Sequence, residues 1–317
     1  MSYIYSSELK APKKMPEIDP LRPQMAGMLK FLALTHQKQS SAFQAPQGLS
    51  LNKIHFSSMD GTEIPCFVIE AADKQKSAPG ILMIHGGAFY TPVQTASLSL
   101  ACAYAAGLGA TVFLPEYRLL PAFSAPKALE DCYALWHELL RSAAAFGLDT
   151  TRLLVFGDSA GAALAAGLCL VLRDRKEMLP KGQVLIYPVL DDRSERYPSY
   201  HECAEAPWSP EANRLMWAAY LKNAEPSMLP YLVPARSEDL RDLPESYVEP
   251  QEIDILRDEG IAFSDALKKD GVSVVLHVIK GSYHGFDSDL ASPLVQEAVR
   301  SRIAAARAML GESSLKP

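Results

Sequence analysis

A serine between two glycines is the residue of this chain best suited to act as a nucleophile. Gly157-Asp158-Ser159-Ala160-Gly161 follows the apolar run 153–156 and precedes a run of small and apolar residues at 162–172. A strand that turns directly into a helix crowds the residues beside the turn, and glycines relieve that crowding because they lack Cβ. The helix N-terminus favours negative charge near Ser159. The motif therefore predicts acyl transfer with Ser159 as nucleophile.

A second glycine-rich segment, His85-Gly86-Gly87-Ala88, follows the apolar run 81–84. Acyl transfer develops negative charge on the carbonyl oxygen, and backbone N–H groups of a closely approaching loop stabilise that charge. We expect the donors of this oxyanion hole to be Gly86, Gly87 and Ala160. His85, at the end of a buried strand, is expected to hold the loop by hydrogen bonds and not to act as the base.

Ser159 needs a histidine as base, and the histidine needs a carboxylate behind it, in the chain order serine, acid, histidine. Three histidines follow Ser159. His201 lies in a proline-rich segment and His277 lies inside an expected strand. His284 stands in the loop beyond that strand, at the same sheet edge as the serine, and is the predicted base.

Four carboxylates follow the expected strand 246–249, and the catalytic acid should be one of them. Asp258 and Glu259 fall in the first turn of an expected helix, where a carboxylate interacts favourably with the helix dipole. Asp254 lies midway between strand and helix and is free to reach the histidine loop. Spacing alone favours Asp254 and leaves Glu252 as the second candidate.

Short apolar runs separated by helix-length segments indicate how these residues are positioned. The expected strands are 81–85, 111–115, 153–157, 184–187, 246–249 and 272–279. The expected helices are 97–108, 126–146, 160–173 and 257–269. This alternation predicts a three-layer α/β sandwich around a mostly parallel sheet. Upstream, Asp60-Gly61 between two apolar runs predicts a β-hairpin over 51–71.

Two regions depart from the alternation, residues 1–48 and 191–243. The second is rich in proline but contains a helical pattern at 210–223. We expect an N-terminal arm and an insertion that together form a cap over the carboxyl edge of the sheet, where open α/β sheets bind ligands. The core then consists of residues 49–190 and 244–317.

Composition and charge exclude several other functions. The 317 residues carry a formal net charge of -6 and contain no block of five or six basic residues, which argues against nucleic acid as a partner. The first ten residues lack the apolar core of a secretion signal, so a cytoplasmic protein is expected. The apolar stretch 153–172 resembles a membrane span in length, but Asp158 and Ser159 lie inside it, and a buried strand and helix explain it better.

The five cysteines are an odd number, widely spaced and without a Cys-x-x-Cys pair, and we expect them to be reduced packing residues. No metal is expected. The apolar run 272–279 could pair with its twin in a homodimer if it is an exposed edge of the sheet.

Together the motifs resemble those of the hormone-sensitive lipase family of esterases. The resemblance spans roughly residues 75 to 310 and rests on His85-Gly86-Gly87-Ala88-Phe89, Tyr117-Arg118-Leu119, Ala128-Leu129-Glu130-Asp131, Gly157-Asp158-Ser159-Ala160-Gly161, Asp254-Ile255-Leu256-Arg257-Asp258-Glu259-Gly260 and His284-Gly285-Phe286. It implies an α/β-hydrolase fold with an eight-stranded sheet and a helical cap, hydrolysis of esters with short or medium acyl chains, and no cofactor. It also places the catalytic acid at Asp254.

This chain departs from the family pattern at three positions. Ala88 replaces the third glycine of the oxyanion loop and costs about 1 kcal/mol of strain if its φ is positive. Ile255 replaces the proline after the acid, and Ala122 replaces a glutamate. None of these changes removes a side chain of the expected triad.

The small-molecule ester is expected to contact aromatic residues beside the oxyanion loop and in the cap. The candidates are Phe89, Tyr90, Trp208 and Trp217, although helical spacing fits cap packing equally well. Two other functions remain open: an amidase or peptidase of the same fold, and a ligand-binding receptor that has lost catalysis. The receptor is disfavoured because Ser159, Asp254 and His284 are all present.

Overall fold

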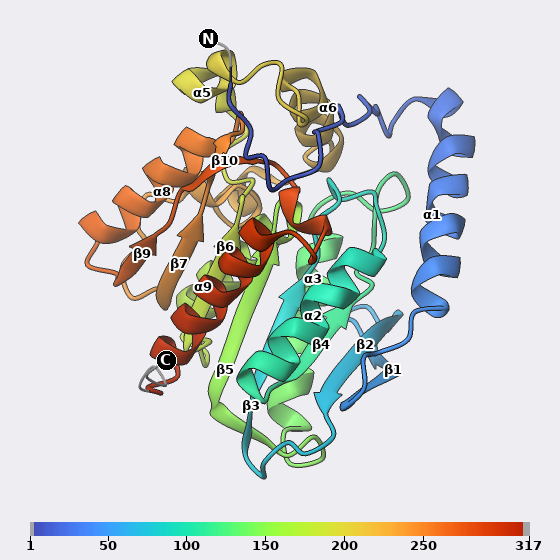
Figure 1. The fold of residues 1–317 in the computed structure, drawn as a ribbon, viewed down its shortest axis with the longest axis vertical. Coiled ribbons are helices and arrows are strands. Elements are labelled where there is room, and N and C mark those ends of the chain that lie inside the picture. Colours follow the sequence, from blue (N-terminus) through green and yellow to red (C-terminus); the bar gives the residue numbers. More distant parts are fainter. Residues whose placement is uncertain (1–2, 313–317) are drawn as a thin grey trace.

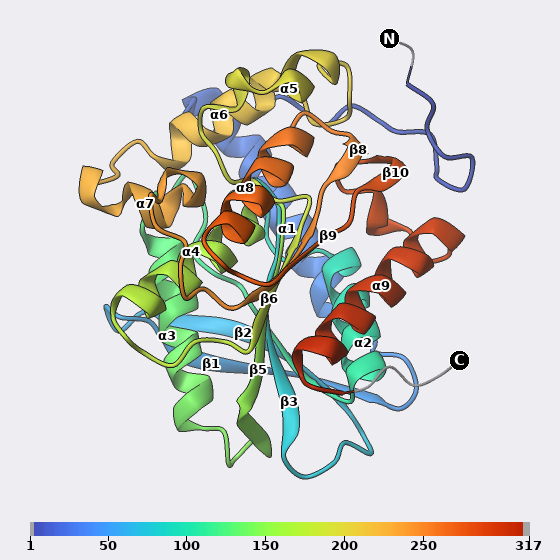
Figure 2. The same cartoon turned by 90° about the vertical axis from the view of Figure 1, so that its left-hand side faces the viewer.

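An eight-stranded sheet runs through the centre of the molecule (Figures 1 and 2), of which the computed structural model describes residues 3–312. Its strand order is β1-β2-β4-β3-β5-β6-β7-β9. The strands are β1 (Leu49–Ser57), β2 (Glu63–Ala71), β3 (Ala78–Ile84), β4 (Thr111–Pro115), β5 (Leu148–Asp158), β6 (Gly182–Ile186), β7 (Glu245–Glu249) and β9 (Val274–Leu276). Only the pairings of β2 with β1 and β4 are antiparallel. The predicted mostly parallel sheet is therefore confirmed.

Helices cover both faces of this sheet. Figure 2 shows α2 (Thr95–Leu108) and α9 (Pro293–Met309) on one side, and α3 (Lys127–Arg141) and α4 (Ala160–Asp174) on the other. The strands between them are apolar on both faces. Along β5, for example, Leu154 and Phe156 belong to one hydrophobic core and Leu153 and Val155 to the other. This burial on two sides explains the continuous apolar runs in the sequence.

The predicted hairpin is formed by β1 and β2, which pair from Leu49 with Ala71 to Ser57 with Glu63. Its turn is held by Arg118, which follows β4. The Arg118 guanidinium donates to Asp60 Oδ2 at 2.6 Å and to the buried Asp131 carboxylate of α3 at 2.6 Å. These bonds fix the hairpin, α3 and the segment after β4 relative to one another.

The N-terminal segment and residues 198–220, between β6 and β7, reach the same end of the sheet (Figure 1), whereas residues 229–232 pack against α4. The helices before β1 and between β6 and β7 are η1 (Pro23–Met25), α1 (Ala26–Ser41), η2 (Ser194–Arg196), α5 (Pro198–Glu202), α6 (Pro210–Tyr220), η3 (Pro226–Met228), α7 (Leu229–Leu232) and η4 (Pro234–Arg236). Residues 3–22, called the arm below, contain no helix or strand. The arm is joined to the segment between β6 and β7 where Met15 N–H donates to the Pro207 carbonyl at 2.8 Å.

The last expected strand, 272–279, is wrong as a single element. The main sheet ends with the short β9, and the chain then forms β10 (Ile279–Tyr283), which pairs in parallel with β8 (Gln251–Ile253) in a separate two-stranded sheet. The change of partner follows from backbone bonding, since His277 N–H still donates to Val248 but Ile279 N–H donates to Pro250. Along the chain, α8 (Arg257–Lys269) connects β8 with β9, and η5 (Phe286–Ser288) lies between β10 and the C-terminal α9.

The long apolar stretch 153–172 is divided between β5 and the buried helix α4, as predicted. Within residues 3–312, no helix combines the length and the apolar character needed to cross a bilayer. The five cysteines are buried and free.

Candidate active site

Ser159 lies in the turn between β5 and α4, with φ 54° and ψ -121°. This backbone conformation is costly for a residue other than glycine and persists only where surrounding contacts impose it. A Cβ at Gly157 would overlap the Gly161 carbonyl, and a Cβ at Gly161 would overlap the carbonyl of Ile84. Both glycines are thus required by the close packing of the turn against β3, as the sequence argument proposed.

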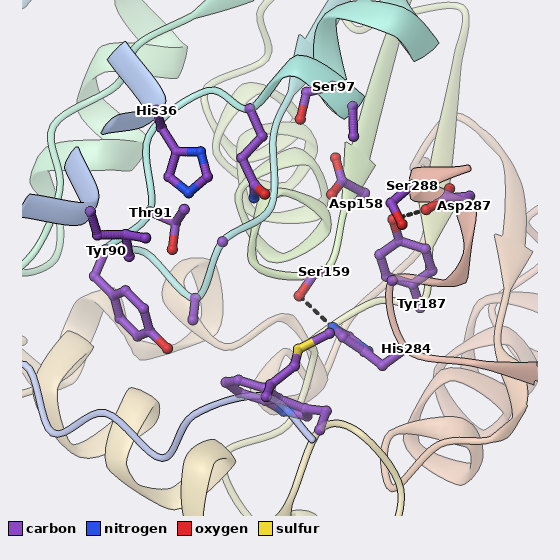
Figure 3. A pocket seen from close by; sticks show the side chains of 18 of the residues that line it. His36, Tyr90, Thr91, Ser97, Asp158, Ser159, Tyr187, His284, Asp287 and Ser288 are labelled. Carbon is purple, nitrogen blue, oxygen red and sulfur yellow. Dashed lines mark hydrogen bonds between the residues drawn. The ribbon is translucent and has the colours of Figure 1, made fainter. Parts of the chain in front are cut away.

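The three predicted triad side chains lie in one chain of hydrogen bonds. Ser159 Oγ is 2.8 Å from His284 Nε2, and His284 Nδ1 is 2.7 Å from Asp254 Oδ2. Figure 3 shows the first of these contacts at the cavity. All three residues are buried, and Leu256 N–H donates to the other Asp254 oxygen at 3.1 Å. Asp254 and His284 follow β8 and β10, so the parallel pairing of these strands brings their loops together.

Glu252, the second candidate for the acid, has a different partner. Its carboxylate accepts the Gly281 N–H at 2.6 Å, a bond that joins β8 to β10. Side chains alternate along a strand, so Glu252 and Asp254 could both face the histidine. The structure instead directs Glu252 to the β10 backbone and leaves the imidazole to Asp254.

A fully buried arginine supports the loop that carries His284. Arg302 of α9 donates to the Glu249 carboxylate at 2.6 and 2.9 Å and to Asp287 Oδ2 at 2.7 Å. Tyr187 O–H donates to the other Asp287 oxygen at 2.7 Å, and the Tyr187 ring lies 4.9 Å from the His284 ring. Asp287 is three residues beyond His284, so these bonds fix the imidazole from behind. Sequence patterns gave no signal for this network.

Trp208 reaches the triad from the segment between β6 and β7. Its indole lies nearly parallel to the His284 ring, with centroids 5.8 Å apart. The indole N–H donates to Asn213 Oδ1 at 3.2 Å, and Asn213 donates in turn to Ser194 Oγ at 3.0 Å. Ser194 O–H donates to the buried Glu259 of α8 at 2.7 Å, and burial raises the pKa of Glu259 to about 8. A continuous polar chain therefore connects the indole with the core.

The prediction that Gly86 donates to the oxyanion needs correction. Its N–H donates to Asp158 Oδ2 at 3.0 Å and so is already occupied. Within residues 3–312, the N–H groups of Gly87, Ala88 and Ala160 have no acceptor. Ala88 has φ 53°, so it does adopt the conformation that alanine tolerates poorly.

Asp158 is the residue that holds this loop against the nucleophile turn. A Cβ at Gly86 would overlap the Asp158 carboxylate, so the approach requires glycine. Burial raises the pKa of Asp158 to about 7, an effect that the nearby Asp287 reinforces and the Gly86 N–H opposes. The carboxyl group thus titrates near neutral pH directly beneath the loop.

His85 holds the same loop, in agreement with the sequence-based expectation. Its Nδ1 is 2.7 Å from the Gly86 carbonyl, its ring stacks on Tyr117 at 4.3 Å, and Tyr117 O–H donates to the His85 carbonyl. Burial lowers the pKa of His85 to about 4, so the imidazole is neutral. No contact connects it with Ser159 Oγ among the described residues.

A cavity of about 390 Å³ opens above Ser159 and His284 (Figure 3). Of the four aromatic residues expected to contact substrate, Tyr90 and Trp208 line it. Phe89 and Trp217 do not. The Phe89 ring instead stacks on Tyr220 at 3.8 Å and lies 6.2 Å from Trp217, which anchors the loop to α6. The arm contributes Met15, Pro16 and Ile18, and α1 contributes Leu32 and His36.

Several known proteins are similar to this chain in sequence and in fold. A family model described as the alpha/beta hydrolase fold matches residues 81–288. Esterase LipI of Mycobacterium tuberculosis is 32% identical over 241 residues, which cover 74% of this chain and 74% of that protein. Ethyl acetate hydrolase of Pseudomonas putida is 30% identical over 241 residues, with 74% and 75% covered. The solved structure of a bacterial heroin esterase is 31% identical, with a TM-score of 0.82 over 93% and 94% of the two chains.

The fold, the turn at Ser159 and these similarities define a hydrolase of the α/β class. Within that class the chain belongs to the hormone-sensitive lipase family, as its motifs indicated, and it is a carboxylic ester hydrolase.

Proposed function

We propose that this esterase hydrolyses short- to medium-chain acyl esters through an acyl-enzyme on Ser159. The observation that carries the proposal is the hydrogen-bond chain from Ser159 through His284 to Asp254, with its serine end open to the cavity. Asp254 accepts the Nδ1 proton of His284, which leaves the Nε2 lone pair to accept the serine proton. In this hydrogen-bond chain, His284 therefore has the tautomer and the orientation that general-base catalysis requires.

In the first step, Ser159 Oγ attacks the ester carbonyl while His284 Nε2 takes the serine proton. The negative oxygen of the tetrahedral intermediate accepts from the free N–H groups of Gly87, Ala88 and Ala160. His284 then gives its proton to the departing alcohol, and the acyl group remains on Ser159. Water, deprotonated by His284, repeats the sequence and releases the acid.

The dimensions of the cavity support small substrates. About 390 Å³ accommodates a short acyl chain and a small alcohol, whereas a long alkyl chain would extend beyond the lining residues. The relative from Pseudomonas putida is named for hydrolysis of ethyl acetate, itself a small ester.

A homodimer through β9 remains a prediction. The exposed edge of β9 is short, although Val275 is 47% exposed, and offers little surface for pairing. The molecular mass in solution would show whether the protein is a monomer or a dimer.

Initial rates on p-nitrophenyl esters from acetate to palmitate test this proposal, with the wild type and the Ser159→Ala variant measured side by side. We expect activity that falls as the acyl chain lengthens and that is lost in the variant. Matched p-nitroanilides test the amidase alternative, and faster cleavage of the amides would favour it. Activity that persists in Ser159→Ala would overturn the assignment of the nucleophile.

A further inference from the structure

One end of the cavity carries four uncharged polar side chains that the hydrolysis mechanism does not use. They are His36 from α1, Thr91 and Gln94 from the loop after Gly87, and Ser97 from α2. Figure 3 shows His36, Thr91 and Ser97 around the space above Ser159. We call these four residues the polar subsite.

Three polar atoms of this subsite, the hydroxyl oxygens of Thr91 and Ser97 and Nδ1 of His36, have no hydrogen-bond partner within the described part of the chain. The hydroxyls of Thr91 and Ser97 belong to residues only 8% and 9% exposed, yet neither makes a hydrogen bond to another residue of the range 3–312. His36 Nδ1 is buried and likewise unpaired. Buried polar groups are normally satisfied, so a cluster left open toward a cavity indicates a ligand that completes the bonding.

The lining of the cavity also defines the charge of that ligand. No lysine or arginine is among the described residues that line it. Its carboxylates are engaged elsewhere: Asp158 accepts from Gly86, and Asp287 accepts from Tyr187 and Arg302. Burial lowers the pKa of His36, so at neutral pH its imidazole is uncharged and offers one donor and one acceptor. An anionic group would find no counter-ion here.

We propose that the polar subsite binds an uncharged hydroxyl or carbonyl group of the ester, so that the enzyme prefers substrates with such a group over their alkyl counterparts. This preference rests on the proposed function and adds the substrate class to it. An alkyl chain would displace water from the four side chains and leave their hydrogen bonds unmade, whereas a hydroxyl or carbonyl group would replace those bonds. Sites built to hydrogen-bond a substrate discriminate strongly against analogues that lack the group.

Matched ester pairs test the subsite on both sides of the scissile bond. On the acyl side, p-nitrophenyl levulinate is compared with p-nitrophenyl pentanoate. On the alcohol side, butyl acetate with a hydroxyl group at the end of its butyl chain is compared with pentyl acetate, in which a methyl group takes the place of that hydroxyl. The ratio of kcat/KM values in each pair is divided by the ratio of the hydroxide-catalysed rates, which removes intrinsic reactivity. We expect the polar member to be favoured by roughly tenfold in at least one pair.

Two variants locate the preference. Thr91→Val keeps the shape of the side chain and Ser97→Ala removes a single hydroxyl, and each should lower the corrected ratio by about three- to tenfold. Ser264→Ala is the matched control, because it removes an unpaired serine hydroxyl that is fully buried on α8 and does not line the cavity. A corrected ratio near one in both pairs, or a ratio unaffected by both variants, would overturn the proposal while leaving the esterase mechanism intact.

Binding measured without turnover separates the two proposals. Calorimetric titration of the Ser159→Ala variant with the same ester pairs gives their dissociation constants directly. Tighter binding of the polar member supports the subsite whether or not the wild type hydrolyses either ester, and equal binding contradicts it. Absence of hydrolysis in the wild type would contradict the proposed function alone.

Discussion

The α/β core and the cap contribute to the site in different ways. The core supplies the groups that we propose to react, and each stands where a strand ends: Ser159 after β5, Gly87 after β3, Asp254 after β8 and His284 after β10. The cap and arm supply walls, such as Trp208, and contribute no member of the triad. Backbone geometry therefore fixes the chemistry, whereas individual side chains fix the shape and polarity of the space above it. Substitutions in the two regions should accordingly affect different kinetic parameters.

The largest effect is expected when the acid behind His284 is altered. Asp254→Asn keeps the shape of the side chain but no longer selects the productive tautomer of the imidazole, and kcat should fall by about 10⁴-fold. The matched variant Glu252→Gln changes the neighbouring carboxylate, which binds the Gly281 N–H, and should leave kcat within about tenfold of wild type because no reacting group is altered. Steady-state rates on p-nitrophenyl butyrate compare the two. A greater loss in the Glu252 variant would reverse the assignment.

The buried arginine behind the histidine loop should matter most for stability. Arg302→Met leaves the carboxylates of Glu249 and Asp287 buried without their partner, and the free energy of unfolding should fall by about 3 to 5 kcal/mol. Arg300→Met on the same helix is the control. The Arg300 side chain is 63% exposed, so this substitution should change the free energy of unfolding by no more than about 0.5 kcal/mol. Urea unfolding measures both. Equal effects would mean that the buried network contributes nothing specific.

Removal of the cap residue nearest the triad should impair turnover without removing the nucleophile. Trp208→Ala deletes the indole that lies over His284, so the imidazole loses a wall and kcat/KM should fall by roughly 10- to 100-fold. Labelling with a p-nitrophenyl phosphonate, which reports reactive Ser159, should still go to completion. Trp217→Ala, outside the cavity, is the comparison expected to act mainly on stability. Failure of the Trp208 variant to react at all would place this cap residue within the catalytic machinery.

The smallest expected effect is the pH dependence of stability that Asp158 introduces. Its folded-state pKa of about 7 lies above the ordinary value of 3.8, so between these pH values the folded protein retains a proton that the unfolded chain has lost. The free energy of unfolding contributed by this group therefore decreases as pH rises, by less than about 1.4 kcal/mol per pH unit. Asp158→Asn should flatten this decrease between pH 4 and 7 in urea titrations. An unchanged slope would contradict the raised pKa.

Sequence patterns predicted that Ser159, Asp254 and His284 lie together because motif, strand and loop all constrain those residues in the same way. They placed Gly86 wrongly as a donor because its N–H is taken by Asp158, a partner 72 positions away that motif spacing does not reveal. The aromatic pattern likewise failed to separate Trp208, which lines the cavity, from Trp217, which packs against Phe89 and Tyr220. Helical periodicity identifies a buried face but not what that face contacts.

The polar subsite and the support behind His284 were not predictable for a related reason. His36 and Ser97 lie on helices, where single polar residues are ordinarily solvated, and Arg302 resembles a surface residue of an amphipathic helix. Only tertiary packing buries Ser97, Arg302 and the Nδ1 atom of His36. The division of 272–279 into β9 and β10 was also set by tertiary packing, because it depends on which backbone carbonyl each N–H of this segment meets.

The arm over the cavity has a consequence for the speed of the enzyme. Its attachment includes backbone bonds from Ser6 to Gly281 and from Met15 to Pro207, and residues 3–22 form no helix or strand that must unwind before it lifts. Segments of this kind open locally at a much lower free energy than the whole fold. Because Met15 and Ile18 form part of the roof, lifting the arm clears a path for products. We therefore expect an upper limit on turnover that is set by the frequency of arm opening and is the same for all esters.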